Sequence, residues 1–394
     1  MTSQAEEETR VNEPGPVNKK RRRLITGAVA FVCLMAAAGG AFYLTGGFDK
    51  WRDRQSFDEA CQGVMDGDTV RSALGSDAVR AIPDGGAFIF GDNGKSIAQC
   101  HAKDREWEGG KDRERGVMTV DIRWASHAAR ANWGIHHIFA NGYEGIGYPV
   151  GYGWRGSVVS NEEIVPVMRG AVELTCRNKS GERLLVATSQ RGLTMDEAAS
   201  DQYRTRFAQA LTGTATNAAK KFGCDAELGK PVERVPSTAP YLELASKPLD
   251  RATGVCAPLA GMTPDARRQN APLAAGSPKD PDSLAEDCFL IRGKGKRQFE
   301  SVFRFMALYG RAAENIGKSE DGFDRYPGAS GQRETATWAT AQCPDHRKAL
   351  YLAGTVGRGE PAVPSEADEF ERKALRAFAQ QSANEHGCTN LRTP

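Results

Sequence analysis

The longest uncharged stretch of the chain is residues 24–48, LITGAVAFVCLMAAAGGAFYLTGGF. At about 1.5 Å per residue, a helix of this length can cross a hydrocarbon core of about 30 Å. Five consecutive cations, Lys19 to Arg23, stand directly before it. The positive-inside rule therefore predicts a disordered basic cytoplasmic tail over 1–23, a transmembrane helix over 24–48 and an exported C-terminal part. The lipid bilayer is the first predicted partner.

A cleaved signal peptide is the alternative for the same segment. Basic residues precede the apolar run, and Ala36–Ala38 could serve a peptidase. The run is longer than the roughly 7–15 residues of a signal-peptide core, so the pattern favours an uncleaved anchor. The predicted location is the cell membrane, with a single pass and the C-terminus outside.

The rest of the chain mixes strand-like and helix-like patterns. Partial alternation over 118–126 (MTVDIRWAS) and 301–309 (SVFRFMALY) predicts strands, and the amphipathic stretches 201–224 and 367–388 predict helices. Both helical stretches end in Gly-Cys, where Gly223 and Gly387 suit the positive φ of a helix C-terminus. Repeated βαβ units are not visible. We therefore expect an α+β fold of two modules, each an antiparallel sheet packed by helices.

Eight cysteines lie on the predicted exported side, and their spacing repeats. An even number in an oxidising compartment predicts a disulfide framework. The intervals are 39, 76 and 48 residues in the first half and 32, 55 and 45 in the second, with similar neighbours in the same order. This predicts a tandem duplication, against the alternative of chance matches in a Gly-rich chain. The hypothetical pairs are Cys61–Cys100, Cys176–Cys224, Cys256–Cys288 and Cys343–Cys388.

The stretch 229–252 contains four prolines and no clear period, so it is interpreted as a linker. The modules then cover 53–228 and 253–394. The formal net charge is +2, and the excess lies in the first 48 residues. The balanced remainder argues against nucleic-acid binding, which needs a basic surface.

Motifs for cofactors, metals and catalysis are weak. Gly151 to Gly156 fits G-x-G-x-x-G, but Pro149 precedes it and a strand-like stretch follows, so no cofactor is predicted. No H-E-x-x-H occurs, and no metal is predicted. G-x-S-x-G and S-x-x-K are also missing from the sequence. A dispersed Ser/His/Asp triad stays open, because its members need not be close in sequence.

The six histidines are His101, His127, His136, His137, His346 and His386.

The most distinctive stretch is 132–156, which combines aromatic rings with glycines. Such rings can stack on sugars or bind partner proteins. The alternative is that they pack the core of the module. Alignment from Tyr148-Pro149 to Tyr326-Pro327 places Ser330 and Gln332 at the positions of Tyr152 and Trp154, which would make these two rings specific to the first module. The candidate binding residues are Tyr143, Tyr148, Tyr152, Trp154 and Arg155.

A family resemblance supports the location. The basic anchor, the cysteines, the segment YPVGYGWRGSVV and the closing pattern FxxALxxxxxxAAxxxGC resemble actinobacterial single-pass envelope proteins to which no activity is attached. The resemblance implies a place in the envelope and no function.

The function that we expect is a membrane-anchored envelope protein with a non-catalytic binding or assembly role. Its partner would be an envelope protein or a cell-wall polymer. An envelope hydrolase with a dispersed active site is the alternative, and a spacer within a larger membrane complex is a third interpretation.

Overall fold

The computed structural model describes most of the chain after residue 46. The described residues are 47–83, 96–104, 116–128, 145–161, 167–194, 196–197, 200–235, 246–294, 298–316, 326–333, 336–344, 347–355 and 364–394, with 29, 34, 35, 37, 40 and 43 before them. The chain forms two units, Met1–Arg52 and Asp53–Pro394, and the two sheets belong to the second.

Most of the predicted membrane segment 24–48, and the tail 1–23, lie outside the described residues. No described helix has both the length and the apolar character that a membrane span needs. The membrane helix therefore remains a prediction.

The first sheet has seven antiparallel strands in the order β1-β2-β3-β7-β6-β5-β4. Its strands are β1 Val79–Pro83, β2 Ala98–Asp104, β3 Val117–Trp124, β4 Gly147–Gly151, β5 Trp154–Asn161, β6 Val167–Thr175 and β7 Arg183–Arg191. The helices before and after these strands are α2 Gly47–Ala60, α3 Gly67–Leu74, α4 Ala125–Ala128 and α7 Asp201–Lys221.

The second sheet has eight strands in the order β12-β13-β14-β11-β10-β9-β8, with β15 also paired to β13. They are β8 Lys247–Pro248, β9 Leu273–Gly276, β10 Ala285–Lys294, β11 Gln298–Tyr309, β12 Ser330–Arg333, β13 Ala336–Gln342, β14 Lys348–Thr355 and β15 Thr389–Arg392. The helical elements are η2 Leu249–Arg251, η3 Gly254–Met262, α9 Thr263–Arg268, α10 Arg311–Ile316 and α11 Pro364–Glu385.

Six strands of each sheet share one order and one register, β1-β2-β3-β7-β6-β5 in the first and β9-β10-β11-β14-β13-β12 in the second. In each, a row of six paired residues crosses the sheet through the second cysteine of its module. The rows are Pro83, Cys100, Val120, Thr188, Gly170 and Val158, and Gly276, Cys288, Phe305, Ala353, Thr337 and Gln332. Cys176 and Cys343 both stand six residues after the β6 or β13 member of the row. Two tandem modules of the same plan, as expected from the cysteine spacing, account for this agreement.

All four hypothetical disulfides are confirmed. The structure joins Cys61 to Cys100, Cys176 to Cys224, Cys256 to Cys288 and Cys343 to Cys388. Gly223 and Gly387 have φ angles of 64° and 63°, as expected for glycines at helix C-termini. Each of the four disulfide bonds therefore joins two cysteines of the same module.

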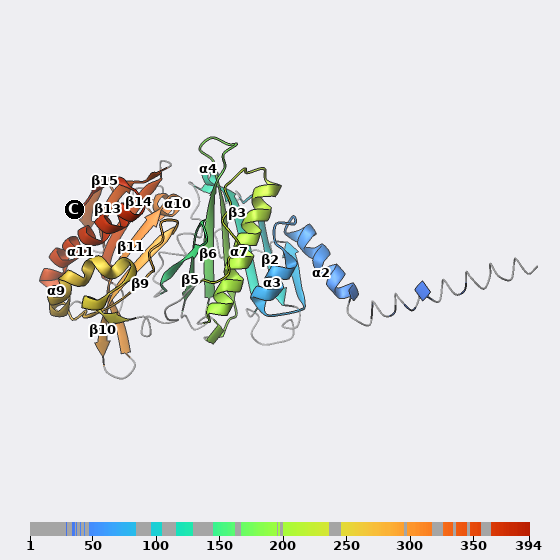
Figure 1. Ribbon diagram of the computed structural model, residues 1–394, viewed down its shortest axis with the longest axis horizontal. Helices are drawn as coiled ribbons and strands as arrows, with labels where there is room; N and C mark the ends of the chain where they lie inside the picture. Colours follow the sequence, from blue (N-terminus) through green and yellow to red (C-terminus); the bar gives the residue numbers. More distant parts are fainter. Residues whose placement is uncertain are drawn as a thin grey trace, which may run out of the picture. The chain divides into compact units, whose positions relative to one another are not determined.

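Three apolar clusters arrange the body in layers. One lies between the first sheet and α3 and α7, another between the second sheet and α9 and α11, and the third joins the two sheets. The third cluster forms because alternate residues of β7 and β14, such as Leu185 and Leu350, point away from the helices. Helices α3, α7, α9 and α11 thus cover the outer faces, and the sheets pack on each other (Figure 1). The sequence predicted the helices on one face but not the sheet-on-sheet contact.

The segment interpreted as a linker is packed at both ends. Lys230 donates its backbone N–H to the carbonyl of Tyr152 at 2.8 Å, so residues near 230 lie on the first module. Lys247–Pro248 pairs with β9, and Leu249 is buried in the second core. Residues 236–245 lie outside the described part.

Candidate functional site

The structure places two of the candidate aromatic residues in the first core. Tyr148 and Trp154 are buried, and the Trp154 indole Nε1 donates to the carbonyl of Lys230 at 2.8 Å. Neither ring is exposed for stacking on a ligand. Arg155 donates to the Thr175 hydroxyl at 3.3 Å, and Tyr143 lies outside the described residues.

Tyr152 remains half-exposed, at 37 % of its surface, and has a φ of 59° in the turn between β4 and β5. Its hydroxyl accepts the backbone N–H of Arg234 at 3.0 Å. From α7, Gln209 donates to the carbonyl of Val232 at 2.8 Å, and Thr205 accepts the N–H of Val235 at 3.1 Å. The β4–β5 turn and α7 therefore hold the chain's own segment 229–235, which we call the clasp segment.

A glycine is required where the clasp segment crosses Trp154. A Cβ built on Gly229 would lie 2.4–2.6 Å from three atoms of the Trp154 ring. Real Cβ atoms do not approach so closely, so the backbone of the clasp segment lies directly on the indole. Trp154 thus contributes to holding the protein's own chain.

The strand register corrects the alignment of the two modules around these residues. Val158 pairs with Gly170 and Gln332 with Thr337, so Val158 corresponds to Gln332 and Gly156 to Ser330. The sequence alignment, which set Trp154 against Gln332, is wrong by four residues. The matched residues stand at different places in the two modules, because Tyr148-Pro149 and Arg155 lie in β4 and β5, whereas Tyr326-Pro327 precedes β12 and Arg333 ends it. The pairing of strands is fixed by the ladder and gives the true correspondence.

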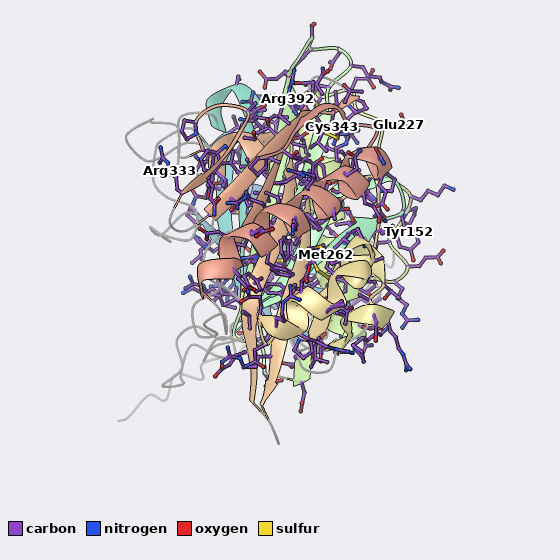
Figure 2. The ribbon with its side chains drawn as sticks, turned by 90° about the vertical axis from the view of Figure 1, so that its left-hand side faces the viewer. Tyr152, Glu227, Met262, Arg333, Cys343 and Arg392 are labelled. Atoms are coloured by element: carbon purple, nitrogen blue, oxygen red, sulfur yellow. A yellow bond between two sulfur atoms is a disulfide. The ribbon has the colours of Figure 1, made fainter. Side chains whose placement is uncertain are left out.

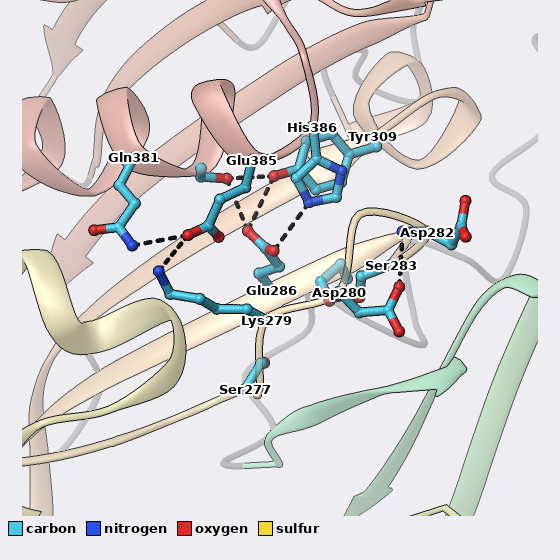
Figure 3. Close-up of polar contacts among 12 residues, drawn as sticks. Ser277, Lys279, Asp280, Asp282, Ser283, Glu286, Tyr309, Gln381, Glu385 and His386 are labelled. Carbon is cyan, nitrogen blue, oxygen red and sulfur yellow. Dashed lines mark hydrogen bonds and ion pairs between the residues drawn. The ribbon is translucent and has the colours of Figure 1, made fainter. Parts of the chain in front are cut away.

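A polar cluster inside the second module is the strongest functional candidate that the sequence did not predict. Glu286 of β10 lies at its centre (Figure 3). Its Oε1 lies 3.0 Å from His386 Nε2. Its Oε2 accepts the hydroxyls of Ser382 at 2.7 Å and Tyr309 at 3.0 Å, and these two hydroxyls also contact each other. All four side chains are at most 4 % exposed.

Aromatic rings surround the carboxylate. The His386 ring stacks on Tyr309 with centroids 3.8 Å apart, and Tyr351 meets Tyr309 edge-on at 6.4 Å. Burial, and next the charge of Glu286, raise the pKa of Tyr309 well above its ordinary value. The same two causes raise the pKa of Tyr351. Both tyrosines therefore stay protonated, and Tyr309 can only donate to Glu286.

The corresponding positions of the first module are apolar. By strand register and distance from the closing cysteine, the cluster Glu286, Tyr309, Tyr351, Ser382 and His386 corresponds to Ala98, Trp124, Val186, Ala218 and Phe222. The shared fold is thus built without the cluster in one of its two copies. A buried polar network that the fold does not need is a candidate for a specific role.

The loop between β9 and β10, which follows Gly276 and leads to Glu286, connects the cluster to the first module. Lys279 forms an ion pair with Glu385 at the end of α11, and Gln381 donates to the same carboxylate at 2.8 Å. Farther along, the carbonyl of Asp282 accepts the N–H of Gly156 at 3.1 Å. The Ser157 hydroxyl accepts the N–H of Leu284 at 3.0 Å. One loop therefore contacts both the last turn of α11 and strand β5.

The arrangement of the cluster differs from that of a hydrolase triad. In a triad the serine hydroxyl contacts the imidazole, which takes its proton. Here the carboxylate lies between them and accepts from both. The chemistry that this geometry supports is proton exchange within the Glu–His pair, with the two hydroxyls orienting the carboxylate.

Among the other histidines, His101 is buried and its Nδ1 lies 2.9 Å from the Thr119 hydroxyl. His136, His137 and His346 are outside the described part, as is the side chain of His127. Within the described residues, no group of three or more His, Cys, Asp or Glu side chains is placed to hold a metal ion.

Two of the hollows on the described surface are lined by residues outside the cluster. One, of about 280 Å³, lies between α9 and α11 and is lined by Asp265, Arg268, Gln269, Glu366, Glu369, Phe370 and Lys373. Its charges are paired with one another, as in the 2.7 Å contact of Lys373 with Glu369. The second, of about 270 Å³, lies near α3 and includes Arg71 and Asn217.

A signal for part of the cluster was present in the sequence. His386 and Phe222 both precede a Gly-Cys pair, so the aligned helices differ visibly there. Ser382 lies on α11, one turn before His386, whereas Glu286 and Tyr309 come from β10 and β11, and only the sheet register and the packing of α11 bring them to the cluster.

The comparisons with known proteins leave the family open. No family model matches the chain, and no curated protein matches it. Two solved structures are weakly similar. The di-domain ARO/CYC StfQ from the steffimycin biosynthetic pathway has 10 % identity and a TM-score of 0.13, over 78 % of this chain and 86 % of that one. The di-domain ARO/CYC BexL from the BE-7585A biosynthetic pathway has the same identity and TM-score, over 75 % and 85 %. At these scores neither supports an argument about fold or function.

Proposed function

We propose that this protein is a single-pass membrane protein of the cell envelope whose two disulfide-clamped modules bind another envelope component. The observation that carries the anchor is the exposure of large apolar side chains at the described positions between residues 29 and 51. Tyr43 is 70 % and Trp51 54 % exposed, and Val29, Leu34 and Met35 are also exposed. Apolar surface of this extent needs a cover, and aromatic residues favour the edge of a bilayer.

Further support comes from the position of the aromatic rings. Tyr43, Phe48 and Trp51 stand in succession, with ring centroids 6.3 and 5.8 Å apart. They lie at the end of the uncharged segment and before the first disulfide. The four disulfides suit an oxidising compartment outside the membrane.

For the binding surface we propose the exposed side chains around the contact between the β4–β5 turn and the clasp segment. In the body, the large apolar side chains of the described part that remain exposed are Tyr152, at 37 %, and Leu228, at 40 %. Tyr152 lies in the β4–β5 turn, and Leu228 directly precedes the clasp segment, whose Lys230 donates its N–H to the carbonyl of Tyr152. In Figure 2 the side chains of Tyr152 and Glu227 lie along the same edge of the body. An aromatic ring held rigidly beside Arg234 suits a protein or wall-polymer partner.

The hydrolase alternative is not proposed. The serine, histidine and acidic residue that the structure brings together are arranged with the carboxylate in the middle, and no described contact joins the serine to the imidazole.

The anchor is tested with the tagged full-length protein in membranes. We expect it to resist alkaline carbonate extraction, and external protease to reach the body but not the N-terminal tag. Extraction into the soluble fraction, or cleavage of the N-terminal tag in sealed membranes, would refute the anchor.

The binding surface is tested by crosslinking in cells. A Tyr152→Ala/Leu228→Ala variant should lose the partner that the parent captures. Tyr152→Phe, which keeps the ring and removes only the hydroxyl, is the matched control and should retain it. Equal capture by parent and double variant would place the interface elsewhere.

A further inference from the structure

The pair of Glu286 and His386 is the part of the polar cluster that can change charge near neutral pH. Imidazole gains or loses its proton between about pH 5 and 8. Nε2 of His386 lies 3.0 Å from Oε1 of Glu286, and both side chains are buried. A buried carboxylate without a cation is costly, whereas an adjacent imidazolium neutralises it. Uptake of one proton thus converts a buried net charge into an ion pair.

Most neighbours of His386 favour the charged imidazole. Glu286 faces it from β10, and the ring of Tyr309 from β11 stacks on it. His386 follows directly after α11, where the helix dipole attracts cations. Asp280, in the β9–β10 loop, is close enough for the charge of His386 to lower its pKa, although burial raises that pKa overall.

The remaining groups contribute less or oppose the charge. Lys279 is the nearby cation, and Glu385 neutralises it. Tyr351, from β14, stays protonated. Nδ1 of His386 makes no hydrogen bond to the described residues, which is unfavourable when it carries a proton. The carboxylate of Glu286, 3.0 Å from Nε2, faces the imidazole on its other side within the buried site.

We propose that His386 and Glu286 form a proton-operated latch, which fastens the end of α11 to β10 while the imidazole is charged and loosens when the proton leaves. The latch would regulate binding by the two modules, so this role rests on the proposed function. Its test requires neither the membrane anchor nor a partner, so failure of the latch and failure of the proposed function are distinguishable.

Loosening would reach the first module through the β9–β10 loop. Lys279 holds the loop to Glu385 of α11, and Asp282 and Leu284 hold it to Gly156 and Ser157 of β5. Strand β5 begins two residues after Tyr152. The latch and the proposed binding surface are therefore connected by these contacts and by the short backbone stretches between them.

The first module supplies the design of the variants. It has Ala98, Ala218 and Phe222 where the second has Glu286, Ser382 and His386. The triple variant Glu286→Ala/Ser382→Ala/His386→Phe introduces these three apolar residues and keeps Tyr309 and Tyr351. His386→Gln is the minimal variant, because an amide can still donate to Glu286 but cannot become charged.

The measurement is hydrogen exchange of the backbone amides of residues 382–388, in the full-length protein in detergent micelles from about pH 5.5 to about pH 8.5. After correction for intrinsic exchange, wild-type protection should fall with rising pH by up to about tenfold per pH unit across the titration, the limit for one proton. Residues 218–224 of the same molecule, which include Phe222, are the internal control and should show constant protection. Both variants should show constant protection over 382–388.

Several results would overturn the latch. Wild-type protection that is constant or increases with pH contradicts it, as does an unchanged pH dependence in His386→Gln. If the triple variant does not fold, the imidazole ¹⁵N resonances of the wild type decide the question, with His386→Gln assigning the signal. A neutral imidazole across the whole range would exclude the proposal.

Discussion

Glu286 and Asp287 are consecutive residues of β10 whose carboxylates serve opposite faces of the second sheet. Glu286 points toward α11 and accepts from Ser382 and Tyr309. Asp287 points toward the first module, where it accepts the N–H of Gly147 at 3.2 Å and pairs with Arg304. Side chains of neighbouring residues in a strand point to opposite faces of the sheet. Glu286 therefore contacts the helix layer, and Asp287 contributes to the contact between the two modules.

Removal of the Asp287 carboxylate should weaken the contact between modules. Asp287→Ala removes a buried carboxylate that accepts from both Arg304 and Gly147, and we expect a loss of about 3 kcal/mol in the free energy of unfolding. Asp287→Asn keeps an acceptor for Gly147 and should lose less. Urea unfolding at neutral pH measures both. Equal losses would mean that the hydrogen bond to Gly147 contributes little and that the charge of Asp287, which both variants lack, accounts for the effect.

Gly229→Ala should displace the clasp segment from Trp154. The added methyl group would overlap the indole, and we expect a cost of about 1–3 kcal/mol with faster proteolysis near residue 230. Gly261→Ala is the control, since no atom lies within 4 Å of its added Cβ and its φ is not positive. Limited proteolysis with thermolysin compares the two variants. A protease-resistant Gly229→Ala would show that the segment adapts.

Trp154 and Tyr152 should differ strongly as alanine variants. Trp154 is part of the first core, so Trp154→Ala should cost about 3–5 kcal/mol. Tyr152 is half-exposed, so Tyr152→Ala should lower the free energy of unfolding by about 1 kcal/mol or less. Thermal unfolding of the two variants gives the comparison. A small effect of Trp154→Ala would contradict its assignment to the core.

Glu371 makes the second module sensitive to pH in the acid range. Burial raises its pKa from 4.5 to about 6, although the Thr337 hydroxyl donates to it at 3.1 Å. An acid whose pKa rises on folding stabilises the folded state at low pH, and this contribution is lost as the pH increases through about 6. We expect the loss to be on the order of 1–2 kcal/mol.

Glu371→Gln should remove that contribution, so the variant gains stability relative to wild type between about pH 4.5 and pH 7. Denaturant unfolding at several pH values measures the difference. The first module has Phe207 and Gly170 at the corresponding positions, so Glu371→Phe/Thr337→Gly is a second, apolar variant. A constant difference between Glu371→Gln and wild type would refute the assignment.

The sequence predicted what depends on local signals. Cysteine spacing, the Gly-Cys helix ends and partial alternation were sufficient for the α+β class, the two modules and all four disulfides. These features are local, because each disulfide closes a loop within its own module. The contact between the two sheets was not predicted from the sequence. Buried charged residues, such as Asp121 and Arg123, interrupt the apolar pattern on the face of β3 that points away from the helices.

The candidate site was harder to predict for a related reason. The aromatic residues of 148–154 attracted attention because rings and glycines are conspicuous in a sequence, yet Tyr148 and Trp154 serve the core. Glu286, Tyr309 and Ser382 are ordinary residues in strand-like or helical stretches. Their meeting depends on the register of β10 with β11 and on the packing of α11, neither of which is encoded within a short window.

The pairing of the eight cysteines has a consequence for how the protein is made. Among the eight bonded cysteines, the first is joined to the second, the third to the fourth, and so on along the chain. No disulfide therefore encloses or crosses another. If the body emerges into an oxidising compartment from its N-terminal end, every second cysteine meets a single unpaired thiol, and that thiol is its native partner. Oxidation during translocation would therefore reach the native set directly, without reshuffling by an isomerase.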